Sequence, residues 1–327
     1  MKHILITGGA GFIGSNFINY FAKKYPNYHL FNLDVLNYAS NLAYVENLPN
    51  HTFIHGDICN RALVEEIFTT HNIDSIIHFA AQSHVDNSIQ TPQDFITTNI
   101  QGTFVLLDVA YRAWGANNGV FLHISTDEVF GTLGKNGSFS ESSPYAPNSP
   151  YSASKAASDM LVRSYHHTYG LNTFITNCSN NYGPNQHDEK LIPTIIRNAL
   201  KGEPIPIYGD GSNVRDWLFV LEHCYGLDKV FHSTYFGESF NIGGHNECSN
   251  LKLAHRICAM LDRLKPLKNG SYSQQITFVK DRLGHDKRYA INANKIAAKL
   301  AWKPTMPFSE GLAITINWYL KKYATIL

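Results

Sequence analysis

The sequence is poor in charge and has no long apolar run. Charged residues make up 16% of its 327 residues, against roughly 25% in an average soluble domain. Lysine and arginine number 27 and aspartate and glutamate 26, which gives a net charge of +1. This balance argues against nucleic acid as a partner and against an acidic tail. No apolar run approaches the ~20 residues that span a bilayer, so we expect no membrane partner either.

Cysteines are few and follow no pattern. The five are Cys59, Cys178, Cys224, Cys248 and Cys258, and no two of them form a CxxC pair. The segment after Met1 reaches its first glycines too soon for the apolar core of a signal peptide. These features predict a reduced, cytoplasmic protein without a disulfide framework or a metal site.

Hydrophobic residues, 44% of the chain, alternate between strand-like and helix-like runs. Strands are predicted at His3–Thr7, His29–Leu33, Thr52–His55, Ser75–Phe79, Gly119–Ile124 and Asn172–Thr176. Helices are predicted at Phe12–Tyr25, Ala62–His71, Gln93–Ala113, Tyr151–Tyr169, Leu191–Lys201, Leu251–Leu264 and Ser309–Lys322. This order predicts an α/β fold, a doubly wound Rossmann-type parallel sheet with a smaller α/β C-terminal substrate domain. We expect the nucleotide-binding domain over residues 1–178, with some later segments returning to it, and the second domain over residues 179–327.

A glycine-rich turn joins the first predicted strand to the first predicted helix. The segment Thr7–Gly14 reads TGGAGFIG. Glycines permit the tight turn and let backbone N–H groups at a helix N-terminus approach a pyrophosphate. The loop residues expected at a dinucleotide are Gly8, Gly11, Phe12, Ile13 and Gly14.

Acidic residues after the next strands indicate which dinucleotide is bound. Asp34 ends the second predicted strand, 20 residues after Gly14. It is placed to bind a ribose 2′-hydroxyl, and no arginine adjoins it to receive a 2′-phosphate. Asp57, after the third strand, is expected near the adenine. The sequence therefore predicts NAD rather than NADP.

A tyrosine and a lysine four residues apart open the helix predicted at Tyr151–Tyr169. Tyr151 and Lys155 face the same way on a helix. An ammonium beside a phenol favours the phenolate, which can take a proton from an alcohol. Thr126, Asp127 and Glu128 follow the fifth strand, and open parallel sheets bind ligands beyond the carboxyl ends of their strands. A YxxxK pattern alone arises often by chance, but these features in this order predict a catalytic site.

Together these motifs resemble the extended short-chain dehydrogenases/reductases, and within them the nucleotide-sugar 4,6-dehydratases. The resemblance covers nearly the whole chain. Its segments are AAQSHVD at 80–86, ISTDEVFG at 124–131, SPYSASK at 149–155, NCSNNYGP at 177–184, EKLIP at 189–193, PIYGD at 206–210, RDW at 215–217, IGGHNE at 242–247 and DRLGHDKRY at 281–289. The acid pair after Thr126 separates dehydratases from epimerases that share the fold.

The resemblance implies a role for each catalytic residue. Tyr151 accepts the proton of the carbon-4 hydroxyl while hydride leaves for NAD, Thr126 hydrogen-bonds that hydroxyl, and Lys155 binds the nicotinamide ribose. Glu128 then removes the carbon-5 proton, and Asp127 protonates the hydroxyl that leaves carbon 6. This division requires surroundings that push the two carboxyl pKa values apart. Return of the hydride to carbon 6 gives a 4-keto-6-deoxy sugar.

Binding residues are also implied by the resemblance. Those along the cofactor are Asp57, Ile58, Ala80, Ala81, Thr98 and Asn181, beside the glycine turn, Asp34, Tyr151 and Lys155. Those along the nucleotide sugar are Ser83, Thr126, Asn180, Lys190, Leu191, Pro206, Tyr208, Arg215, Asn250, Arg282 and His285. The implied substrate is dTDP-glucose, and the implied assembly is a homodimer in which Gln93–Ala113 and Tyr151–Tyr169 pair as a four-helix bundle. The alternatives are a UDP-glucose 4,6-dehydratase, a nucleotide-sugar 4-epimerase and a non-catalytic NAD-binding scaffold.

Overall fold

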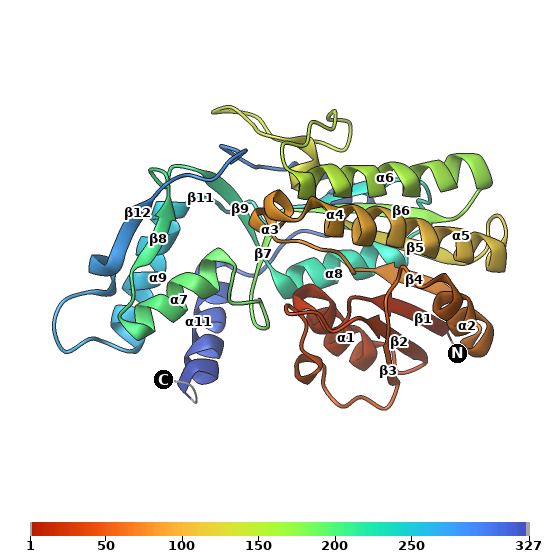
Figure 1. Cartoon of the computed structure of the whole chain (residues 1–327), viewed down its shortest axis with the longest axis horizontal. Coiled ribbons are helices and arrows are strands. Elements are labelled where there is room, and N and C mark those ends of the chain that lie inside the picture. The colour runs from red at the N-terminus through yellow and green to blue at the C-terminus, as the bar shows by residue number, and fades with distance from the viewer. Residues whose placement is uncertain (1, 325–327) are drawn as a thin grey trace.

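A seven-stranded parallel sheet forms the larger half of the molecule (Figure 1). The structure is a computed structural model and describes residues 2–324. Met1 and residues 325–327, which the two predicted domains include, lie outside the described residues. The strand order is β10-β6-β5-β4-β1-β2-β3. Its strands are β1 (Lys2–Thr7), β2 (Tyr28–Asp34), β3 (His51–His55), β4 (Ser75–His78), β5 (Val120–Thr126), β6 (Thr173–Cys178) and β10 (Ser239–Ile242).

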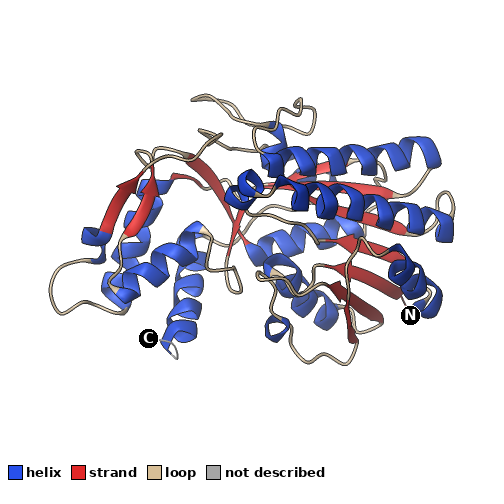
Figure 2. Ribbon diagram, in the orientation of Figure 1, coloured by secondary structure: helices blue, strands red, loops and turns tan. Residues whose placement is uncertain are grey.

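Helices cover both faces of this sheet, as Figure 2 shows. One face carries α1 (Phe12–Lys24), α8 (Val220–Phe231) and α10 (Asn294–Leu300), and the other carries α2 (Arg61–His71), α5 (Thr103–Trp114) and α6 (Pro150–Tyr169). Successive residues of β1 alternate between the two cores, with Ile4 and Ile6 against the first set and Leu5 against the second. Strands buried on both faces read as continuous apolar runs, which is why the sequence predicts them well.

The smaller half packs three helices against two small sheets. The helices are α7 (Leu191–Lys201), α9 (Asn250–Leu264) and α11 (Phe308–Ala324). One sheet has the order β11-β9-β7, and the other pairs β12 with β8. The strands are β7 (Asn180–Tyr182), β8 (Ile205–Tyr208), β9 (Val214–Phe219), β11 (Glu247–Ser249) and β12 (Ile276–Val279). Apolar side chains of all three helices share one core.

The predicted fold class is confirmed, and the six predicted strands lie within two residues of their observed ends. The helix predicted at Gln93–Ala113 is wrong as one regular helix. It divides into α4 (Pro92–Phe95), a π-helical stretch over Ile96–Gly102, and α5. Within that stretch the Asn99 side chain bonds Gln82 and Ser154. The short α3 (Val85–Gln90) precedes α4.

Two absences hold for the described part of the chain. No helix within residues 2–324 is long and apolar enough to cross a membrane. No group of three His, Cys, Asp or Glu side chains among these residues is arranged to hold a metal ion. The five cysteines are all free thiols.

Candidate active site

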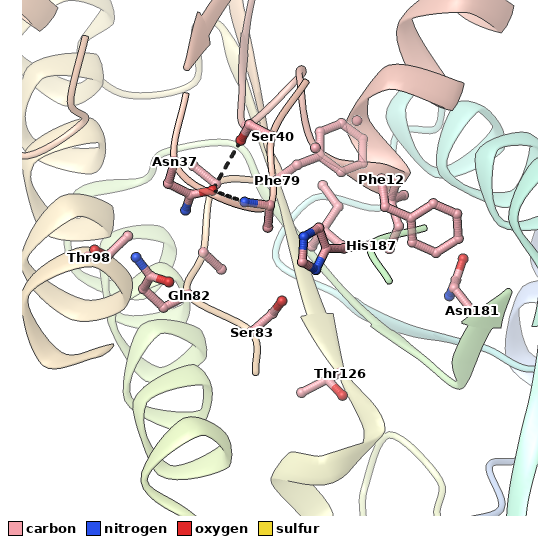
Figure 3. Close-up of a pocket in the computed structure, with 18 of the residues that line it drawn as sticks. Phe12, Asn37, Ser40, Phe79, Gln82, Ser83, Thr98, Thr126, Asn181 and His187 are labelled. Carbon is pink, nitrogen blue, oxygen red and sulfur yellow. Dashed lines mark hydrogen bonds between the residues drawn. The ribbon is translucent and has the colours of Figure 1, made fainter. Parts of the chain in front are cut away.

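A cavity of about 480 Å³ lies at the carboxyl ends of the sheet strands and extends to the segment that enters the smaller half. Figure 3 shows Thr98 and Gln82 on one side of it and Asn181 on the other. Every residue predicted to be catalytic or to bind the cofactor lines this cavity. These residues come from separate stretches of the larger half and from the segment that leads into the smaller half. They therefore come together only in the folded chain. Their individual roles remain predictions.

The glycine turn leaves a helix end open to the cavity. Gly8 has φ +72°, and a Cβ there would lie 2.6 Å from the Ala80 nitrogen. A Cβ on Gly14 would meet the carbonyl oxygen of Gly8, so both positions require glycine. Helix α1 begins at Phe12, and no side chain caps it at Gly11. The N–H groups of its first turn therefore lack intrahelical acceptors, and this end fits a pyrophosphate.

Asp34 presents a fixed carboxylate at the end of β2. It is 5% exposed and accepts hydrogen bonds from the Ala10 and Leu36 nitrogens, each at 2.9 Å, and from Ser40 Oγ at 3.0 Å. Figure 3 shows Ser40 and Asn37 in the loop that follows. A carboxylate held this way suits a ribose diol and repels a 2′-phosphate. With the open helix end, the donors and acceptors present fit NAD.

The tyrosine and lysine lie on the first two turns of α6. Ser149 and Ser152 form a reciprocal capping box, and Pro150 occupies the first turn, so the helix begins immediately before Tyr151. Lys155 Nζ donates to the Ile124 carbonyl oxygen at 2.8 Å and lies 3.2 Å from His123 Nε2.

Burial is the main influence on the pKa of Tyr151. Burial, followed by the charge of Glu128, raises the pKa of the Tyr151 phenol well above its usual range. The phenol is desolvated near the Glu128 carboxylate, while Lys155 is engaged by Ile124 and His123. Stabilisation of the phenolate by Lys155 stays a prediction.

Asp127, which is buried, and Glu128, which is partly exposed, form an acidic pair in a 3₁₀ turn after β5. Thr126 Oγ1 caps this turn by accepting a hydrogen bond from the Glu128 nitrogen at 3.3 Å. Burial and then the charge of Glu128 raise the pKa of Asp127 well above its usual range. Burial also raises the pKa of Glu128, but Arg282, Arg215 and Lys190 oppose that rise. Two neighbouring carboxyls thus have unlike surroundings, as an acid and a base require.

The predicted substrate residues divide into two groups. Ser83, Thr126, Asn180 and Lys190 line the cavity, and Lys190 Nζ donates to the Ser83 carbonyl oxygen at 2.9 Å. The residues outside its lining are Leu191, Pro206, Tyr208, Arg215, Asn250, Arg282 and His285. The sequence motifs do not distinguish these two groups.

Three of the outer residues lie close together on the smaller half. The Tyr208 hydroxyl donates to Asp86 at 3.4 Å, Arg282 lies 3.8 Å from the same carboxylate, and the Tyr208 ring is 6.2 Å from the His285 ring. The buried Arg215 stacks over the Tyr289 ring at 4.3 Å and is close enough to Glu128 to act on its charge. Arginines can bind phosphates in bidentate fashion, and the role of Arg215 and Arg282 at a diphosphate stays a prediction.

Several cavity residues escape prediction from the sequence. They include Tyr38, Gln82, Ser125, Ser179, Gln186 and His187. Gln82 lies inside the AAQSHVD segment and Ser125 inside ISTDEVFG, so adjacency to a predicted residue is a usable signal for them. Nothing in the sequence points to Tyr38, which reaches the cavity because its loop packs near Asn87 and Glu189.

A parallel sheet whose glycine turn shares a cavity with a YxxxK pair defines a short-chain dehydrogenase/reductase. A family model described as GDP-mannose 4,6 dehydratase matches residues 5–315, and the chain belongs to this family. The dTDP-glucose 4,6-dehydratases of Xanthomonas campestris and Salmonella typhimurium are 50% and 49% identical to it, over 97% of this chain and 92% of each relative.

Solved structures agree with this membership. The crystal structure of a dTDP-glucose 4,6-dehydratase from Streptomyces venezuelae, with NAD bound, has a TM-score of 0.91 at 44% identity and covers 99% of this chain and 98% of its own. A UDP-glucose 4-epimerase from Thermotoga maritima has a TM-score of 0.88 at 26% identity, covering 98% of this chain and 99% of its own. The fold is therefore common to dehydratases and epimerases, and the site has to distinguish them.

Proposed function

We propose that the chain is an NAD-dependent hydro-lyase that converts dTDP-glucose to dTDP-4-keto-6-deoxyglucose. The observation that carries the proposal is a single cavity lined by an oxidation pair, Tyr151 and Lys155, and by an acidic pair, Asp127 and Glu128. Relatives at about 50% identity that carry the name dTDP-glucose 4,6-dehydratase support it. A 4-epimerase uses the same first oxidation but returns the hydride to carbon 4 and eliminates no water, so it does not need the acidic pair.

The first step is oxidation at carbon 4 of the sugar. Thr126 orients the hydroxyl and Tyr151 removes its proton as general base. Lys155, with two of its three N–H groups directed to Ile124 and His123, offers the third to a ribose hydroxyl. When bound, NAD supplies a hydride acceptor for carbon 4, a hydride donor for carbon 6 and a positive charge beside the phenol.

The second step is elimination of water across carbons 5 and 6. The carbon-4 ketone makes the carbon-5 hydrogen acidic, and Glu128 removes it. Burial and the charge of Glu128 raise the pKa of Asp127, so this carboxyl is the proton donor of the pair and gives its proton to the departing hydroxyl. One Asp127 oxygen is buried and has no hydrogen-bond partner among the described residues, which leaves it available to the substrate.

The assembly we propose is a homodimer in the cytoplasm. Apolar side chains are exposed along the outer surface of the α4–α6 region: Ile96, Phe104, Met160 and Tyr169, each more than 40% exposed. Helices α5 and α6 pack side by side at the edge of the molecule (Figure 1). Exposed apolar side chains on neighbouring helices favour association, and pairing with a second copy would make a four-helix bundle.

Product analysis tests the proposed reaction. Purified protein with NAD is incubated separately with dTDP-glucose and with UDP-glucose, and the products are identified by NMR. We expect a 4-keto-6-deoxy product from dTDP-glucose and none from the Tyr151→Phe variant. Formation of the galactose isomer would identify an epimerase instead. A 4-keto product from UDP-glucose alone would identify UDP-glucose, not dTDP-glucose, as the substrate. No conversion of either sugar would overturn the proposal.

A further inference from the structure

Lys155 contacts a buried polar cluster, and the proposed reaction steps give no role to the carboxylate of that cluster. His123 of β5 and Asp159 of α6 are both fully buried, and Asp159 follows Lys155 by one helical turn. We infer that Asp159, acting through His123, is a positioning residue that keeps Lys155 an ammonium with one N–H group directed into the cavity. The inference rests on the proposed function, because it concerns the lysine of that site.

The contacts form a chain from the cavity into the interior. Lys155 Nζ lies 3.2 Å from His123 Nε2, and the same Nε2 lies 3.2 Å from Asp159 Oδ1. The other Asp159 oxygen accepts hydrogen bonds from Ser125 Oγ at 2.8 Å and the Tyr145 hydroxyl at 2.9 Å. These two donors fix the carboxylate in one orientation, so its free oxygen faces the imidazole.

The imidazole links the two charges because one nitrogen meets both of them. When Nε2 accepts from Lys155, the His123 hydrogen is on Nδ1. Asp159 Oδ1 lies 3.2 Å from the same Nε2 and has no hydrogen-bond partner among the described residues, so its charge faces the imidazole uncompensated. His123 Nδ1 has no hydrogen-bond partner among the described residues, so no second hydrogen bond fixes the tautomer of the ring. Burial lowers the pKa of His123 well below its usual range, and the charge of Lys155 adds to this effect. His123 is therefore a neutral bridge.

Asp159 is the counter-charge for Lys155. The titratable groups that face the lysine are His78 from β4, His123 from β5, Cys178 from β6, and Tyr151 and Asp159 from α6. Burial raises the pKa of the Cys178 thiol and of the Tyr151 phenol, and it lowers the pKa of His78. These three groups are neutral near pH 7. Among the groups that face Lys155 within residues 2–324, only Asp159 then carries a negative charge.

The balance between burial and this counter-charge sets a working range. Burial lowers the pKa of Lys155 to about 8, and the charge of Asp159 acts in the opposite direction. Burial raises the pKa of Asp159 to about 6, while Lys155 and the hydrogen bonds from Ser125, Tyr145 and Asn177 lower it. Between these two values the lysine is cationic and the aspartate anionic, which is the state that the oxidation step needs.

The test is the charge-removing variant Asp159→Asn, studied as the NAD-loaded enzyme. An opposite charge nearby shifts a pKa by about 1–3 units, so we expect the alkaline limb of kcat to move toward acid by about 1 pH unit or more, with KM little changed. An unchanged alkaline limb would overturn the inference. Tyr145→Phe removes one hydrogen-bond donor to Asp159 but keeps its charge. The pKa of Asp159 should then rise, and the acid limb of the kcat profile should move to higher pH. An acid limb that stays in place in this variant would also count against the inference.

A second readout does not depend on turnover. The ¹⁵N resonance of Lys155 Nζ, assigned by its loss in Lys155→Met, is titrated in the parent protein and in Asp159→Asn. We expect a lower lysine pKa in the variant, and equal values would refute the counter-charge. The matched control is Asp228→Asn, which removes a buried carboxylate that pairs with Lys24. Asp228 lies on α8, on the face of the sheet opposite to α6, so the variant should leave the Lys155 titration unchanged. Absence of 4-keto product would reject the proposed reaction without altering this result.

Discussion

Neighbouring residues of like chemistry acquire different roles here because their surroundings differ. Asp127 is sealed next to a second carboxylate, whereas Glu128 lies within reach of three cations. The first is therefore the better proton donor and the second the better acceptor. Residue type and spacing identify this pair in the sequence. The difference between its two members follows from burial and from arginines that are far away in the sequence but close in the fold.

Replacing Glu128 with glutamine separates the two steps of the proposed reaction. Glu128→Gln keeps Tyr151, Lys155 and Thr126, so oxidation at carbon 4 should continue while removal of the carbon-5 proton fails. Loss of a general base costs about 10²–10⁴-fold in rate. We expect nicotinamide absorbance to rise in a single turnover and 4-keto-6-deoxy product to fall by that factor. The control is Glu247→Gln, whose carboxylate pairs with Arg288 away from this pair; normal turnover in Glu128→Gln would show that another group is the base.

The motifs predict which residues meet in the cavity but not their protonation. The position of Lys155 on the helix suggests a lysine aimed at Tyr151. The structure directs it to His123 and Ile124, which precede it in the chain by about thirty residues. Only the folded arrangement of β5 against α6 brings these groups together, so the raised pKa of the phenol is not accessible from a local pattern.

At the scale of elements, apolar periodicity predicts strands and helices where burial is uniform and fails where buried residues are polar. Helix α8 carries Glu222 and Asp228, both buried. Glu222 accepts hydrogen bonds from the Thr305 and Met306 nitrogens, so its burial depends on a segment some eighty residues later. Strand β10 has four residues and joins the sheet only by pairing with β6. Neither element carries enough local signal to be predicted.

Asp228 joins α8 to α1, and removing its charge should weaken that packing. Its carboxylate accepts hydrogen bonds from Tyr20, Tyr25 and Lys24 and lies 2.8 Å from His232 Nδ1. Breaking a buried charged cluster costs about 3–5 kcal/mol. We expect Asp228→Asn to lower the free energy of unfolding by about that amount in urea at pH 7. Asp108→Asn, which removes a more exposed pair with Arg61 and Arg112, should cost about 1 kcal/mol or less; equal losses would contradict this account.

The carboxylate of Asp228 also predicts how the free energy of unfolding depends on pH. Burial raises the pKa of Asp228, but the hydrogen bonds from His232, Lys24 and the two tyrosines outweigh it and hold the pKa well below its ordinary value. Its contribution is therefore complete above the unfolded pKa of about 3.9 and is lost as pH falls below it. The difference in unfolding free energy between the parent protein and Asp228→Asn should shrink below about pH 4. A difference that stays constant into acid would show that the carboxylate's charge is not responsible.

At the scale of the whole molecule, the two halves meet through polar contacts beside the cavity. Lys190 of the smaller half bonds Ser83, and Tyr208 and Arg282 approach Asp86. Each half has its own apolar core, although Leu218 of β9 packs into the core of the larger half. The contacts at the cavity are thus individually weak and polar, which suits a cleft that has to admit and release a charged nucleotide sugar.

The exposed apolar surface predicts the oligomeric state. Introducing two charges with Phe104→Glu and Met160→Glu should prevent burial of this surface, because an unpaired charge at a dimer interface is costly. Sedimentation should give a dimer for the parent protein and a monomer for the double variant. The control is Leu267→Glu with Phe278→Glu, two exposed apolar residues of the smaller half, which should stay dimeric. A double variant that sediments as the parent does would place the interface elsewhere.

Tracing a single hydrogen tests the central claim most directly, namely that this cavity first removes a hydride and then returns it to another carbon. The protein with NAD is supplied with dTDP-glucose that carries deuterium at carbon 4, and the product is examined by NMR and mass spectrometry. We expect a 4-keto product with deuterium on carbon 6 and no net reduction of the cofactor. Deuterium that stays on carbon 4, or a product whose carbon 6 keeps its hydroxyl, would contradict it.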